Sequence, residues 1–178
     1  MKKTQIILII FILTFGIGCK GQVNGSGIEF YVQNIPHPIL TNKNPEKCYC
    51  CIELSKNNLY TEPLINDLDI EEFNWEKQRI KLTENGMKKF VELDFSTNGV
   101  YGIPTAIVLN GKPIYSVMIF PIGSSVACDR AYVHLSNDSS EFYIHYGAGI
   151  GKNEMRYGGD PRFNLELKKY VNKKFKNN

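Results

Sequence analysis

Hydrophobic and polar residues alternate along much of the chain after Ile28, in short runs that end near glycine, proline or asparagine. A period of two residues is typical of strands with one buried face. The pattern predicts strands over residues 28–32, 51–54, 69–75, 79–83, 105–109, 114–120, 131–135 and 141–146.

One internal segment has helical spacing instead. Thr83 is a suitable N-cap for a helix through residues 84–93. Its apolar face would be formed by Met87, Phe90 and Val91. Gly86 lies near the start of this segment and weakens the helix by about 1 kcal/mol relative to alanine.

A second helix is predicted near the carboxyl end. Asp160 is placed to cap it, with Pro161 at the first helical position. The buried stripe of this helix would consist of Phe163, Leu167, Tyr170 and Val171.

The strongest turn signal is Asn110-Gly111, which predicts a hairpin between strands 105–109 and 114–120. The return strand is apolar on both faces except at Ser116, so we expect other parts of the chain to cover both faces. The order of strands, helix, strands and helix predicts an α+β fold. It would have a mostly antiparallel sheet, with the central helix and the C-terminal helix packed on one face.

The amino terminus is typical of a secretory signal. Lys2 and Lys3 precede an apolar run over residues 6–15, and small residues lead to Cys19. This ending resembles a bacterial lipobox, which implies cleavage after residue 18, a lipid on Cys19 and firm attachment to a membrane. An ordinary signal peptide that ends near a cysteine is the alternative.

The lipobox interpretation divides the chain into a signal peptide (1–18), a lipidated cysteine with a flexible tether (19–27) and one domain (28–178). We expect the protein in a bacterial cell envelope, at the outer membrane and facing the periplasm or the cell surface. Lys20 fits this location, because an aspartate at that position would suggest retention at the inner membrane.

The charge of the chain gives no reason to expect nucleic acid as a partner, since the formal net charge is only +3. Lysines do gather near the carboxyl end, at positions 168, 169, 173, 174 and 176. They indicate either a solvated helix face or attraction to anionic lipid headgroups.

Catalytic and nucleotide motifs fail on spacing. The stretch 147–152 resembles a phosphate loop, but Tyr146 stands where a glycine is needed and Asn153 where serine or threonine is needed. Ser124 is not in a G-x-S-x-G context, although Asp129 and His134 are near it in sequence. We therefore expect a non-catalytic protein with no cofactor and no bound nucleotide.

Four cysteines remain after Cys19, at positions 48, 50, 51 and 128. In an oxidising compartment an even number indicates disulfides. All three possible pairings join Cys128 to one of the clustered cysteines, and the sequence does not decide between them. The alternative is a metal site for Zn²⁺ or Cu(I) built from the same four sulfurs, or a redox function.

The centre of the chain is similar to the first periplasmic domain of the SecD/SecDF protein-export subunits. The similarity covers residues 69–95 and 102–119 and is carried by Ile80, Leu82, Thr83, Gly86, Phe90, Ala106, Ile107, Val108, Leu109 and Gly111. The segment also resembles small bacterial lipoproteins of unassigned function. The chain shows no transmembrane bundle after it, so the resemblance implies a module that holds another polypeptide.

These observations predict a membrane-anchored envelope lipoprotein that acts by binding a protein, as an accessory or as an immunity-type inhibitor. The expected partners are the membrane, through Cys19, and an envelope protein. The residues suggested for the partner surface are Tyr115, Phe120, Ser124 and Ser125, and the alternative for the two aromatic residues, which the pattern favours, is buried packing. The competing hypothesis is a thiol-based metal-binding or redox protein.

Overall fold

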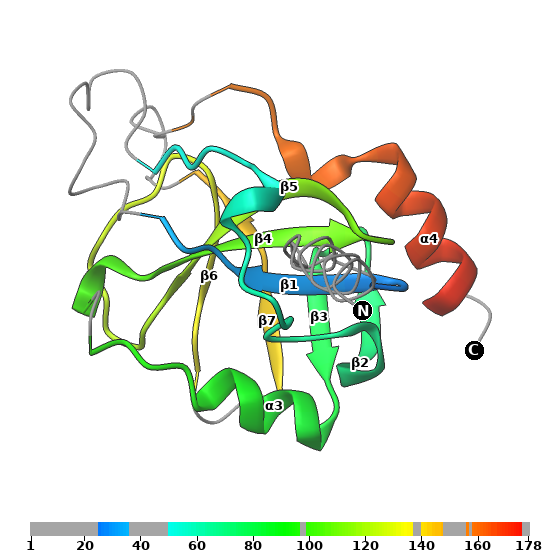
Figure 1. Ribbon diagram of the computed structural model, residues 1–178, viewed down its shortest axis with the longest axis horizontal. Coiled ribbons are helices and arrows are strands. Elements are labelled where there is room, and N and C mark those ends of the chain that lie inside the picture. The colour runs from blue at the N-terminus through cyan, green and yellow to red at the C-terminus, as the bar shows by residue number, and fades with distance from the viewer. Residues whose placement is uncertain are drawn as a thin grey trace, which may run out of the picture.

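The computed structural model describes residues 25–35, 50–96, 99–136, 140–147, 156 and 158–175. This part of the chain forms two sheets, two α-helices and several 3₁₀ turns (Figure 1). The elements are β1 (Ile28–Val32), η1 (Lys56–Asn58), η2 (Asp67–Asp69), β2 (Ile70–Asn74), β3 (Arg79–Leu82), α3 (Glu84–Val91), η3 (Gly99–Tyr101), β4 (Ile103–Leu109), β5 (Lys112–Phe120), β6 (Ala131–His134), β7 (Glu141–Tyr143), β8 (His145–Tyr146), η5 (Pro161–Phe163) and α4 (Leu165–Phe175).

The larger sheet has the strand order β1-β4-β5-β6-β8, and the smaller has the order β2-β3-β7. Every pairing is antiparallel except that of β5 with β6, which is parallel. The predicted α+β class and the mostly antiparallel sheet are therefore confirmed.

The central hairpin forms where the turn signal predicts it. Asn110 and Gly111 adopt positive φ angles of 49° and 72°, as a two-residue hairpin turn requires. The Asn110 side chain accepts a hydrogen bond from the backbone N–H of Gly27 at 2.8 Å. This contact helps to hold the start of β1 beside the end of β4.

The segment 141–146 is predicted as one strand, and the structure divides it at Ile144. Residues of β7 pair with β3 in the smaller sheet, whereas β8 pairs with β6 in the larger sheet. Ile144 is buried between them, and its N–H donates to the Gln78 carbonyl at 2.9 Å. The chain therefore crosses from one sheet to the other here.

One face of the larger sheet packs on the main core, to which both helices contribute. Phe142 of β7 stacks on Phe90 of α3 at 4.7 Å between ring centroids and meets Phe30 of β1 edge-on at 6.0 Å. Leu167 and Val171 of α4 are buried in the same core. The prediction that both helices pack on one face is thereby confirmed.

The other face of the larger sheet is covered by irregular chain. Residues 51–54 do not form the predicted strand, and they lead into η1, which the Ser55 side chain caps. Leu54 and Leu59 pack near β1 and β4, while Cys50 and Ile52 pack near the end of β5. Figure 1 shows this segment in cyan crossing the sheet. Coverage on both faces explains why β5 is apolar on both sides.

Both helices differ from the sequence prediction at their ends. Thr83 does cap α3, but Val91 is exposed and does not belong to its buried face. Asp160 caps only the 3₁₀ turn η5, and α4 begins at Leu165. The Asn164 side chain accepts from the N–H groups of Glu166 and Leu167 at the start of α4. Phe163 lies before this helix and is about half exposed, so it is not part of a buried stripe.

Candidate functional site

The structure brings two of the predicted cysteines together beneath the second face of the larger sheet. Cys50 and Cys128 are each 1% exposed, and neither is in a disulfide. Their sulfur atoms and a carboxylate oxygen of Asp129 all lie within 4.8 Å of one another. Cys51 is exposed and disulfide-bonded. Cys48 and Cys19 lie outside the described residues.

Two loops hold this cluster in place. The backbone N–H of Cys50 donates to Asp129 Oδ1 at 2.9 Å, and the Cys50 thiol donates to the Ala127 carbonyl at 3.8 Å. Asp129 directly follows Cys128 in the chain. The same segment therefore supplies the Cys128 thiol and the carboxylate that holds the loop of Cys50. Sequence reasoning missed Asp129 as part of the cluster, although its adjacency to Cys128 was a signal.

The surroundings of the two sulfurs are apolar. Met118 and Phe120 of β5 are fully buried against them, and Ile52 and Val126 cover the cluster from the loops. Burial raises the pKa of the Cys128 thiol, and the hydrogen bond with the Cys50 sulfur raises it further. Cys128 is therefore a neutral thiol at physiological pH in the unlinked state.

A row of ring side chains extends outward from the cluster across β6 and β8. Tyr132 lies 5.3 Å from the His134 ring and 5.2 Å from the His145 ring, and Phe120 lies 5.4 Å from His134. Both histidines are exposed at the strand ends, and partial burial of their rings lowers the pKa of each; for His145 the charge effects of His134 and Arg162 lower it further. This ring cluster fits structural packing of the strand ends.

The predicted partner surface is only partly at the surface. Tyr115 is 4% exposed and Phe120 is 0% exposed, so neither can contact a partner, because the two-sided cover of β5 encloses both. Ser124 is half-buried and Ser125 is exposed. The Ser124 hydroxyl donates to the Val100 carbonyl at 2.7 Å, which joins the loop after β5 to η3.

Exposed apolar residues flank that contact in both turns. Val100 is 53% exposed and Ile122 is 54% exposed, and Tyr101 is also at the surface. We call these three residues, with Ser124 and Ser125, the apolar rim. Sequence reasoning missed its apolar members, although isolated apolar residues beside turn glycines such as Gly99 and Gly123 were a signal.

A cleft of about 600 Å³ opens where β1 ends and β4 begins, close in sequence to the apolar rim. Ile103 and Pro104 line it and follow Tyr101 closely in sequence. Its lining is mixed in polarity and consists of Val32, Gln33, Asn34, Ile35, Tyr60, Thr61, Glu62, Pro63, Leu64, Leu93, Asp94, Ile103 and Pro104.

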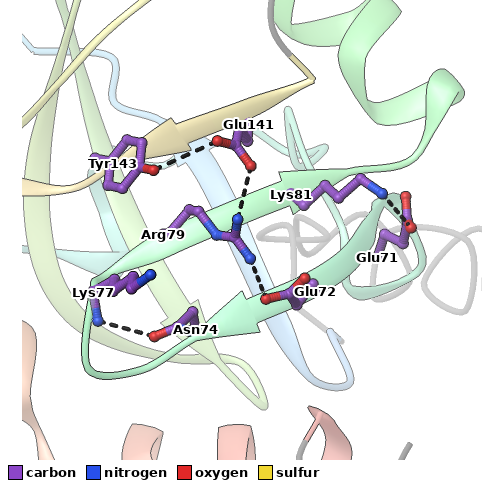
Figure 2. A network of polar contacts seen from close by, with 8 residues as sticks. All are labelled: Glu71, Glu72, Asn74, Lys77, Arg79, Lys81, Glu141 and Tyr143. Carbon is purple, nitrogen blue, oxygen red and sulfur yellow. Dashed lines mark hydrogen bonds and ion pairs between the residues drawn. The ribbon is translucent and has the colours of Figure 1, made fainter.

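The charged surface of the smaller sheet has a different character, because its charges pair across the strands (Figure 2). Arg79 of β3 donates to Glu141 of β7 at 3.1 Å and also to Glu72 of β2. Lys81 pairs with Glu71 at 2.6 Å. Paired, partly exposed charges of this kind fix strand register and contribute little to binding.

Within the part of the chain that the structure describes, no helix is long and apolar enough to cross a membrane. No family model, curated protein or solved structure matches the chain. The similarity to the export subunits and to small lipoproteins therefore stays a prediction.

Proposed function

We propose that this protein is a lipid-anchored lipoprotein of the bacterial cell envelope whose folded domain binds a protein partner without catalysing a reaction. It would serve as an accessory or as an immunity-type inhibitor. The lipobox-like sequence before Cys19 supports the anchor. The exposed apolar rim carries the binding part of the proposal.

Three large apolar side chains in neighbouring turns are unusual on a surface that binds nothing. Single exposed apolar residues are common, but groups of them rimmed by polar residues mark interaction sites. The apolar rim has this composition, because Val100, Tyr101 and Ile122 lie beside the Ser124–Ser125 loop. Because Val100 and Ile122 are each about half exposed, burying what remains exposed would contribute roughly 1 kcal/mol per side chain.

The lysines of α4 support contact with the membrane less strongly. Lys168 and Lys169 are exposed, and lysines close to an anionic membrane surface are attracted to its headgroups. Lys174 is held by the Asp67 carboxylate and by the Asp67 carbonyl. Lys176 lies outside the described residues.

Site-specific photo-crosslinking in intact cells tests the partner surface. A photoreactive residue at Ile122 should yield a discrete crosslinked product, and one at Leu68 should not. Leu68 is the matched control because it is 85% exposed, apolar and in a turn away from the apolar rim. Equal crosslinking from both positions, or none from Ile122, would overturn the proposal.

A second candidate function, metal or redox chemistry at the thiols, is favoured by one observation. Cys50, Cys128 and Asp129 form a group of potential ligands within 4.8 Å. Thiolates suit Cu(I) and Zn²⁺. Metal analysis of the purified chain, compared with a Cys128→Ala variant, would reveal a stoichiometric ion that the variant loses.

A further inference from the structure

The two buried thiols are free in the structure and yet lie against each other. They come from loops about 80 residues apart, and two contacts, from Cys50 to Asp129 and to Ala127, fix the position of one relative to the other. A disulfide needs sulfur atoms that can approach to about 2 Å and Cβ atoms about 4 Å apart. Sulfurs within 4.8 Å on packed loops can reach that geometry by rotation of the side chains.

The state of Cys51 removes the ambiguity that the sequence leaves. Three pairings of the four cysteines are possible in principle. Cys51 is disulfide-bonded, and its partner is neither Cys50 nor Cys128, because both of these are free thiols in the structure. Of the three pairings, this leaves the one in which Cys50 and Cys128 are partners.

The surroundings favour a disulfide over a metal ion at this position. Two thiolates and a carboxylate would place three negative charges beside Met118, Phe120 and Val126 before any ion arrived. Charge in an apolar, water-poor site is costly. One oxygen of the Asp129 carboxylate, Oδ1, already accepts a hydrogen bond from the Cys50 N–H. A disulfide is neutral and leaves that hydrogen bond intact.

We propose that Cys50 and Cys128 form a disulfide in the native protein, which fastens the segment 50–59 over the second face of the larger sheet. This inference goes beyond the proposed function. It requires the oxidising compartment that an envelope location would supply, but it does not depend on the apolar rim.

The oxidation requires a disulfide donor, either a small molecule such as glutathione disulfide or an exchange protein. One thiolate attacks the donor and releases one donor thiol, and the second thiolate then attacks the mixed disulfide and releases the other. Two S–H bonds of the protein are replaced by one S–S bond, and the two electrons and two protons reduce the donor to two thiols. Since both sulfurs are buried, we expect the reaction before the loops have packed or during local opening.

The test uses the full chain purified from membranes in detergent, with free thiols blocked at lysis. We expect Cys128 to resist alkylation after unfolding unless a reductant is added. In a Cys50→Ala variant Cys128 should become alkylated, and in the matched Cys51→Ala variant it should stay protected. Peptide mapping without reductant should join the peptide of Cys128 to that of Cys50.

A stability measurement provides an independent readout. Closing a loop of about 80 residues should raise the thermal midpoint by about 10 °C. Reductant should therefore lower the thermal midpoint of the native chain. The Cys50→Ala/Cys128→Ala double variant keeps only the disulfide at Cys51, so reductant should lower its thermal midpoint by about 10 °C less.

Alkylation of Cys128 in the unreduced native chain would overturn the inference. So would protection of Cys128 that persists in the Cys50→Ala variant, or a metal ion near one per chain that depends on both thiols. If Cys50 and Cys128 are free thiols in cells, oxidation of the folded protein in glutathione buffers shows whether the compartment or the geometry is the reason. If the Cys50–Cys128 disulfide forms in these buffers, the protein is in a reducing compartment in cells and the proposed envelope location is wrong. If it does not form, the two sulfur atoms do not have the geometry that a disulfide needs.

Discussion

Single residues in this protein are explained by contacts that are distant in sequence. Gly86 weakens α3 by intrinsic propensity, yet the structure gives a reason for it. A Cβ atom at this position would lie 2.6 Å from the Asp69 carbonyl oxygen and 2.9 Å from the Asp69 Cβ. The helix can approach η2 this closely only with glycine at position 86.

Gly86→Ala should therefore destabilise the protein, although helix propensity alone predicts a gain of about 1 kcal/mol. Overpacking against backbone costs about 1–3 kcal/mol, so we expect a net loss near 1 kcal/mol in urea unfolding. Val91→Ala is the control within the same helix and should change stability by less than about 0.5 kcal/mol because Val91 is exposed. A stabilised Gly86→Ala variant would refute the close contact.

Asp69 is a buried acid whose carboxylate accepts three hydrogen bonds. Burial alone would raise its pKa, but hydrogen bonds from the Asn66 N–H, Lys89 and Asn85 outweigh burial, and the pKa of Asp69 is lowered. A lowered pKa means that the folded state favours the charged form.

Asp69→Asn should cost about 2 kcal/mol at neutral pH, since it removes charge-assisted hydrogen bonds. The stabilisation by the carboxylate is present above the unfolded pKa of about 3.9 and is lost as the pH falls through the lowered folded pKa. The difference between native and variant chains should therefore shrink at acid pH. Glu76→Gln, in an exposed turn, should show little difference at any pH.

At the scale of elements, the sequence predicts those that depend on neighbouring residues and does not predict those that depend on distant contacts. The hairpin at Asn110-Gly111, the strands around it and the Thr83 cap depend on neighbouring residues, so the sequence predicts them. The crossing at Ile144 depends on which sheet each half of the segment meets, which periodicity does not encode. Residues 51–54 form irregular chain that covers the sheet. Their sequence resembles a strand because only one side of the segment is partly buried.

The candidate site divides in the same way. Cysteine spacing identified the residues, but only the fold shows that Cys50 is the one beside Cys128. Tyr115 and Phe120 belong to a strand that the sequence predicts to be covered on both faces, and the structure buries Tyr115 in the main core and Phe120 beneath the distant loop segment. The apolar rim forms from two turns that meet through Ser124, and no local signal joins them.

The β6–β8 ring cluster predicts an acid-sensitive element. His134 and His145 have lowered pKa values, so the unfolded chain binds protons more readily. Stability should fall as the pH drops below the unfolded value of about 6.5 and level off below the folded values. A His134→Phe/His145→Phe variant should show a smaller decrease in thermal midpoint between pH 7 and pH 5 than the native chain. An unchanged decrease would assign the acid sensitivity to other groups.

At the scale of the whole molecule, we propose that an amino-terminal anchor carries one α+β domain, in which both faces of the larger sheet are covered. The main core and the two helices occupy one side, and the loop segment that we propose to be fastened through Cys50 occupies the other. The apolar rim is the exposed surface to which we assign binding. A tether over residues 19–27 would let this surface reach a partner close to the membrane.

Location in the envelope is the central claim, because both the partner and the disulfide depend on it. The most direct measurement is the mass of the amino-terminal peptide of the chain isolated from cells, compared with a Cys19→Ala variant. We predict a chain that begins at Cys19 with diacylglycerol on its sulfur, and a variant that is neither lipidated nor retained in membranes. A native chain that keeps Met1, or that begins at Cys19 or later without lipid, would contradict the account.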